Sequence, residues 1–109
     1  MSYAQIDPEI HVWAKRHALA LITSWQGSEA RSTYVSSDDG DCFQIWIERP
    51  ADGRVSLHAA GVEGRRADLP PRNWNVAMSD IAQGLEDAFN TVIDWMRPSQ
   101  RRLPTAKEP

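Results

Sequence analysis

The stretch CFQIWIERPADGRVSLHA, residues 42–59, contains two short runs in which apolar and polar side chains alternate. Such alternation is typical of strands with one buried face. The apolar positions of the two runs are Phe43, Ile45, Ile47, Val55 and Leu57. Between the runs, Pro50, Asp52 and Gly53 are turn formers. A connection this short predicts an antiparallel hairpin that turns its apolar face toward the core.

A third strand is expected on the N-terminal side of this hairpin. Residues 31–36, RSTYVS, are rich in β-branched and aromatic side chains, and the DDGD run at residues 38–41 supplies a turn. The pattern weakens over residues 61–76, where two glycines and two prolines interrupt it. We expect Val62 to open at most a short fourth edge strand, and residues 72–74 to lie in a loop.

An N-terminal helix is expected to begin at Asp7. Asp7 and Pro8 are a typical N-cap and first helical residue, and Gly27 is a natural stop. Between them, one stripe at helical spacing is mainly apolar: Ile10, Trp13, Ala14, His17, Ala18, Leu21 and Trp25. We predict a single helix over this stretch, with His17 as a hydrogen-bonded core histidine.

A C-terminal helix is predicted within SDIAQGLEDAFNTVIDWMRP, residues 79–98. Ser79 can cap its N-terminus, and Pro98 follows its end. Its apolar face consists of Ile81, Leu85, Ala88, Phe89, Val92 and Met96. Beyond it the chain is polar and contains further prolines, which is typical of a flexible tail.

These elements predict an α+β fold in two layers. Three or four antiparallel strands would form a meander, with the N-terminal and the C-terminal helix packed on one face. Residues 1–97 would form a single domain, followed by a flexible tail at residues 98–109. The other face of the sheet would be open, and its neighbouring side chains would be Gln44, Trp46, Ser56 and His58.

The composition is that of an ordinary globular protein. The chain has 109 residues, of which 41% are hydrophobic and 25% charged, and its net charge is −3. This acidic balance argues against nucleic acid as a main partner and is compatible with a basic protein partner. The N-terminal segment lacks the pattern of a secretion signal, and no stretch reads as a membrane span. We therefore expect a cytoplasmic protein with no membrane partner.

The reactive side chains do not form a recognisable catalytic or metal-binding pattern. The DDGD run lacks the spacing of a calcium loop. His11 and His17 are six residues apart, whereas the zinc-binding helix pattern places them four apart. Cys42 and His58 would be a candidate dyad only if the strands placed them side by side. We predict no catalytic, cofactor-binding or metal-binding residues, and an enzyme based on Cys42 is a minor alternative.

The outer face of the C-terminal helix is a candidate contact surface. Asp80, Asp87 and Asp94 recur every seven residues, which predicts a line of carboxylates about 21 Å long. A plain solvated helix face is one explanation. Aspartate is a poor helix former, however, and Asp94 falls at the negative end of the helix dipole. The three carboxylates are therefore also candidates for pairing with basic side chains of a partner protein.

Five tryptophans are many for a chain of this length. Three fall on or beside the apolar faces of the helices and are expected in the core: Trp13, Trp25 and Trp95. Trp46 lies on the predicted open face beside His58, and Trp74 lies in the irregular segment. Tryptophan is enriched at interface hot spots, so Trp46, Trp74 and His58 are candidate contact residues. Burial under a loop is the alternative for both tryptophans.

Three features of the chain resemble the immunity protein TriTu family of bacterial polymorphic toxin systems. They are Trp13, the stretch RVSLHAAG at residues 54–61, and the closing stretch DIAQGLEDAFNTVIDWM with Trp95. The resemblance covers residues 10–96 and implies an α+β, non-enzymatic protein. Such a protein binds and neutralises a cognate toxin in the producing cell and is a monomer when free. The aspartate line would then occupy a basic groove, as on a nuclease toxin.

Type III secretion chaperones and similar small adaptors are the main alternative. They are also small, acidic, cytoplasmic α/β proteins, but they usually work as dimers and bind an extended segment of an effector. The mass in solution separates the two classes, because a tight homodimer favours the chaperone and a monomer favours the immunity protein.

Overall fold

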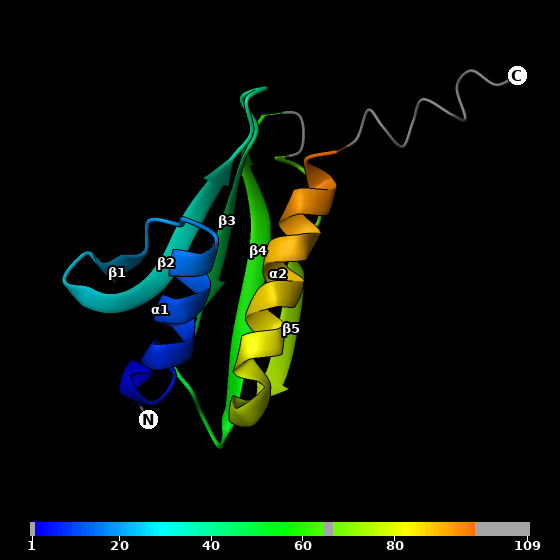
Figure 1. Ribbon diagram of the computed structural model, residues 1–109. Coiled ribbons are helices and arrows are strands. Elements are labelled where there is room, and N and C mark those ends of the chain that lie inside the picture. Colours follow the sequence, from blue (N-terminus) through cyan, green and yellow to red (C-terminus); the bar gives the residue numbers. More distant parts are fainter. Residues whose placement is uncertain (1, 65–66, 98–109) are drawn as a thin grey trace, which may run out of the picture.

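The computed structural model describes residues 2–64 and 67–97 and has an α+β fold (Figure 1). The elements are a 3-10 turn Tyr3–Gln5, helix α1 Asp7–Arg16, strands β1 Ile22–Trp25, β2 Ser28–Ser36, β3 Cys42–Ile47, β4 Arg54–Glu63 and β5 Arg72–Ala77, a 3-10 turn Met78–Asp80 and helix α2 Ile81–Trp95. The predicted order of helix, antiparallel meander and closing helix is confirmed. The predicted tail, residues 98–109, lies outside the described residues. No helix in the described part of the chain has both the length and the apolar character needed to cross a membrane.

The sheet has five strands instead of the predicted three or four, and it is open and antiparallel in the order β1-β2-β3-β4-β5. The predicted hairpin, residues 42–59, lies at its centre, with Ile45 opposite Ala59. In the connection between β3 and β4, Asp52 and Gly53 both have positive φ, at 54° and 75°. Such a pair is typical of tight hairpin turns, so the turn expected from these residues is confirmed.

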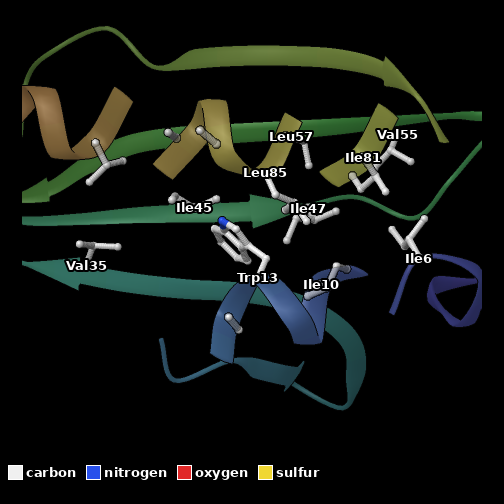
Figure 2. Packing of buried hydrophobic residues seen from close by; sticks show 14 of the residues in the cluster. Ile6, Ile10, Trp13, Val35, Ile45, Ile47, Val55, Leu57, Ile81 and Leu85 are labelled. Carbon is white, nitrogen blue, oxygen red and sulfur yellow. The ribbon is translucent and has the colours of Figure 1, made fainter. Parts of the chain in front are cut away.

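Both helices lie on the same face of the sheet, and the core fills the space between the two layers (Figures 1 and 2). The five predicted sheet positions are each at most 2% exposed: Phe43, Ile45, Ile47, Val55 and Leu57. Helix α1 contributes Ile10 and Trp13 to this core, and α2 contributes Leu85 and Val92. Burying one large apolar side chain contributes about 1.5–3 kcal/mol. The shared core therefore holds both helices against the sheet.

The predicted N-terminal helix is too long. Helix α1 ends at Arg16, and the chain then forms β1. Trp25 consequently lies on an exposed edge strand instead of in the core. The sequence ITSW of β1 is rich in strand formers, and Gln26 and Gly27 form a two-residue turn with positive φ that leads into β2. Pairing with β2 outweighs the helical spacing that these residues also carry.

The prediction for residues 61–76 is also wrong. Val62 lies within β4, which continues to Glu63, and does not open a separate strand. Residues 72–77 form β5 rather than a loop, with Trp74 opposite Leu57 in the register. The two prolines that precede β5 lie outside it, which is where an edge strand tolerates them. They mark the start of this strand rather than its absence.

The residues at the N-termini of the two helices differ from those predicted. Ile6 is the N-cap of α1, and Asp7 is its first residue. Ser79 lies in the 3-10 turn before α2, and Asp80 is the N-cap of α2 without a side-chain capping bond. The carboxylate of Asp7 instead accepts two hydrogen bonds from Arg31 of β2, at 2.7 Å from Nε and 3.0 Å from Nη2. This pair ties the start of α1 to the sheet.

The end of α1 is tied to α2 through Glu86. His17 Nε2 lies 2.9 Å from Glu86 Oε1, and Arg16 donates to the same carboxylate. The His17 ring stacks on Phe89 with 3.9 Å between ring centroids. Burial alone would raise the pKa of Glu86, but the hydrogen bonds from His17 and Arg16 outweigh it and lower this pKa below its ordinary value. The predicted hydrogen bond of His17 is confirmed, but its predicted core position is wrong, because the residue is the half-buried C-cap of α1.

Gly84 allows α2 to approach the sheet closely. A Cβ at this position would lie 2.8 Å from Cδ1 of Leu57 and 3.3 Å from Cγ2 of Val76. Gly84→Ala should lower the free energy of unfolding by about 1 kcal/mol, because overpacking outweighs the gain in helix propensity. Urea unfolding measures this change. Ala82→Gly, on the exposed side of α2, is the control and should lose about 1 kcal/mol through propensity alone. A stabilised Gly84→Ala variant would contradict the close packing.

The pair of Asp7 and Arg31 makes stability sensitive to acid. The hydrogen bond from Arg31 lowers the pKa of Asp7 below its ordinary value of 3.8. The folded state thus favours the ionised carboxylate, and this contribution, complete above about pH 5, is lost as the pH falls through the lower folded-state pKa. Asp7→Asn should lower the free energy of unfolding by about 1–3 kcal/mol at neutral pH. Urea unfolding at a series of pH values should also show a smaller loss of this free energy below about pH 5 than in the unchanged protein. Asp87→Asn, at an exposed position on α2, is the control. If Asp7→Asn lost as much free energy of unfolding below about pH 5 as the unchanged protein does, this role of Asp7 would be contradicted.

Candidate functional site

The sheet face opposite the helices carries a stacked pair of rings at its centre. Trp46 of β3 lies opposite His58 of β4. Their ring centroids are 5.0 Å apart, and the ring planes are inclined by 23°. Both side chains are half-buried. The predicted proximity of Trp46 and His58 on one face is therefore confirmed.

A polar network extends this pair across β3, β4 and β5. Nδ1 of His58 lies 2.7 Å from Oδ1 of Asn73, and Nε2 lies 2.6 Å from Oε2 of Glu48. Next to it, Nδ2 of Asn75 donates to Oγ of Ser56 at 3.0 Å. These contacts orient the imidazole ring, and the indole stacked on it is held in turn.

A hollow of about 420 Å³ lies beside this pair, at β1, β2, β3 and the 3-10 turn Tyr3–Gln5; side chains from both sides of the sheet line it, and we call it the open-face hollow. It is lined by Tyr3, Ile22, Trp25, Glu29, Ala30, Arg31, Ser32, Tyr34, Gln44, Trp46, Ile47 and Glu48. Trp25 is 61% exposed and Tyr34 is 43% exposed. Large aromatic side chains gathered at one concave place and left exposed to water are typical of a binding surface.

The guanidinium of Arg31, in the wall of the open-face hollow, is already paired with a carboxylate. Besides its two bonds to Asp7, Arg31 donates through Nη1 to the carbonyl oxygens of Ala30 at 2.7 Å and Thr23 at 3.3 Å. Its guanidinium carbon lies 4.4 Å from the ring centroid of Tyr3. The hydrogen bond to Asp7 raises the pKa of Arg31, so its charge is permanent. Arg31 is 8% exposed and belongs to the structure of the wall.

A second hollow of about 450 Å³ lies at β5 and α2; we call it the β5–α2 hollow. It is lined by Arg72, Trp74, Asp87, Asn90, Thr91 and Asp94. The guanidinium of Arg72 lies 5.2 Å from the ring centroid of Trp74. Two of the three predicted aspartates thus meet the predicted Trp74 here. Asp80, at the N-cap of α2, is not among the lining residues.

The six predicted contact residues therefore fall in three places. Trp46 and His58 lie on the open sheet face. The tryptophan and two aspartates of the β5–α2 hollow form a second group, on the helix-covered side of the sheet edge, because Trp74 pairs with the inward-facing Leu57. The predicted line of three carboxylates on one helix is wrong for Asp80, because α2 begins at Ile81.

Several residues of the open-face hollow do not stand out in the sequence as contact residues. Residues 10–25 have helical spacing, which predicts Trp25 on a buried helix face. This spacing predicts neither the turn between β1 and β2 nor the position of Glu29 near the start of β2. The alternation in RSTYVS does contain a signal for Tyr34. This residue lies between Thr33 and Val35, both of which are buried on the core side.

Two arrangements considered from the sequence, a group of metal ligands and a Cys42–His58 dyad, can be compared with the described residues. Within residues 2–64 and 67–97, no three histidine, cysteine, aspartate or glutamate side chains are grouped so that they could hold a metal ion. Cys42 lies opposite Glu63, whereas His58 lies opposite Trp46. Four residues of strand, about 13 Å, separate the two positions, so Cys42 and His58 are not cross-strand neighbours. The chain matches no protein-family model, curated protein or solved structure.

The exposed aromatic residues should contribute little to folding. Trp25→Ala and Tyr34→Ala should each change the free energy of unfolding by less than about 1 kcal/mol, because Trp25 is 61% and Tyr34 43% exposed and neither belongs to the core. Trp13→Ala is the contrasting control and should lose about 3–5 kcal/mol, since this indole is buried. Urea unfolding followed by circular dichroism measures all three. A loss above about 2 kcal/mol for Trp25→Ala would assign this indole to the fold instead of to a binding surface.

Proposed function

We propose that this chain is a non-enzymatic binding protein that neutralises a cognate bacterial toxin, and that the toxin contacts the open sheet face. The observation that carries the proposal is the uncovered face itself, where Trp25, Tyr34 and Trp46 line one hollow. A sheet covered on one side offers a rigid surface on the other. Aromatic side chains on such a surface supply contact area at a low cost in conformational entropy.

The charge of the chain supports a basic partner. The net charge is −3. Glu29 and Glu48 lie at the open-face hollow, and Asp87 and Asp94 lie at the β5–α2 hollow. Complementary charge speeds association and loses its effect as salt rises. A toxin with a basic surface, such as a nuclease, fits this balance better than nucleic acid itself does.

The resemblance to the immunity protein TriTu family supports the same proposal. Its quoted features lie at Trp13 in α1, at residues 54–61 in β4, and at Trp95, the last residue of α2. Trp13 is buried, and Trp95 packs against the core, with 5.7 Å between its ring centroid and that of Phe43. These positions support the fold, which leaves the other sheet face for the partner. We propose that the protein acts as a monomer in the cytoplasm of the producing cell.

A type III secretion chaperone or small adaptor is the alternative. The observation in its favour is that β1 and β5 are the two edges of an open sheet. An edge strand can pair with an extended segment of an effector. Light scattering on the purified protein separates the two classes, because a tight homodimer favours the chaperone and a monomer favours the toxin-neutralising protein.

Capture from the native cell lysate tests the proposed function. The tagged protein should retain one basic partner at low salt and release it at high salt, with mass spectrometry as the readout. That partner should be toxic when expressed alone and harmless when this protein is co-expressed. Replacing Trp25 and Trp46 together by Ala should weaken capture at least about tenfold, because aromatic anchors dominate interface energies. Val12→Ala is the control, since it changes an exposed side chain on α1.

Two results would contradict the proposal. If the captured partner is an effector segment with no toxicity of its own, the chaperone class is favoured. If Asp87→Asn combined with Asp94→Asn abolishes capture while the two tryptophan replacements do not, the contact lies at the β5–α2 hollow and not on the open face.

A further inference from the structure

We propose that the open-face hollow binds an arginine side chain presented by the partner protein. This inference rests on the proposed function and specifies the chemistry of the contact. The hollow brings aromatic ring faces and carboxylates to one concave place, and a guanidinium is the protein side chain that binds both kinds of group at once.

The aromatic part comes from three neighbouring strands. Trp25 lies on β1, Tyr34 on β2 and Trp46 on β3, and all three line the hollow. The Trp46 ring is held by its stacking on His58, so it is oriented before a ligand arrives. A planar guanidinium stacks on such rings and keeps its edge available for hydrogen bonds.

The acidic part consists of Glu29 and Glu48, whose side chains are 55% and 58% exposed. The carboxylate of Glu29 lies 3.8 Å from Arg49 and 3.9 Å from Arg31, beyond hydrogen-bond distance. Exposed pairs of this kind contribute about 0–1 kcal/mol, so an incoming cation can replace Arg49. Glu48 holds His58 through Oε2. A carboxylate has about four acceptor sites, which leaves capacity for a guanidinium.

The wall of the hollow makes an anionic ligand a poor fit. Among the described residues, Arg31 supplies the guanidinium that lines the hollow; it donates to Asp7 and to two carbonyl oxygens and is almost completely buried. An anion would therefore meet two exposed carboxylates, and the exposed guanidinium of Arg49, which is not among the lining residues, already lies 3.8 Å from one of them. The same side chain illustrates the chemistry proposed for the ligand, because it combines a two-point contact with a carboxylate and a position over the ring of Tyr3.

A short capped peptide, acetyl-Gly-Arg-Gly-amide, is the probe for this site. Its binding to the ¹⁵N-labelled full chain is followed by NMR through the indole N–H signals of the tryptophans. The signals of Trp25 and Trp46 should shift in a saturable manner, and that of Trp74 should not. The same peptide with citrulline has nearly the same shape without the charge and should bind at least about tenfold more weakly.

Matched variants assign the effect to the hollow. Glu48→Gln and Glu29→Gln should each weaken arginine binding about three- to tenfold, because each removes one charged acceptor. Trp25→Ala should weaken it by a similar factor through loss of a ring face. Glu9→Gln, at an exposed position on α1 that lines neither hollow, is the control and should leave the affinity unchanged.

Several outcomes would overturn the inference. Equal binding of the citrulline peptide, tighter binding of a glutamate peptide, or shifts confined to Trp74 would each do so, as would the absence of any shift at the solubility limit. The inference and the proposed function can fail separately. If a toxin is captured and Trp25→Ala leaves its affinity unchanged, the inference fails and the proposed function stands. If no toxin is captured but the arginine peptide binds as described, the proposed function fails and the site stands.

Discussion

Burial of one face of the central hairpin beneath two helices is the constraint on which the rest of the structure depends. Phe43 and Leu57 are completely buried because α1 and α2 cover the same side of the sheet. Gly84 allows the close approach of α2, and one ion pair at each end of α1 fixes the position of that helix. A strand alternates with a period of two residues, so this one-sided burial also decides which side chains face away.

The candidate binding surface follows directly from that alternation. Trp46 and His58 lie between inward-facing residues on β3 and β4, and they therefore meet on the uncovered face. The polar network around His58 orients the imidazole ring at the centre of this face. Strand β1 then adds the exposed indole of Trp25 at the sheet edge, which lines the open-face hollow together with Trp46. In the proposed function, the partner contacts the uncovered face, while the helices cover the other face of the same strands.

The two-layer fold could be predicted because its signals are local and repeated. The alternation in residues 42–59 and the spacing of the closing helix each contain several positions that agree. Strand β1 could not be predicted in this way, because the segment up to Trp25 satisfies helical spacing as well, and the choice depends on pairing with β2. The contact of Asp7 with Arg31 crosses 24 positions of the sequence, so no local pattern reveals it.

The candidate site was predictable in part for the same reasons. Strand alternation predicts that Trp46 and His58 lie on the uncovered face. The same pattern could have predicted this position for Tyr34. The open-face hollow depends on the position of β1. It could not be predicted, because the spacing of the residues up to Trp25 indicates a helix. Trp74 and the two aspartates at the β5–α2 hollow are neighbours only because β5 forms beside β4 and beneath α2.

Covalent footprinting of the five tryptophans, in the free protein and in its complex with the captured partner, tests the role of the open face most directly. We expect Trp25 and Trp46 to be modified in the free protein and protected in the complex, with Trp13 unmodified in both. Protection of Trp74 in the complex, with Trp25 and Trp46 still modified, would contradict the assignment of partner binding to the open sheet face.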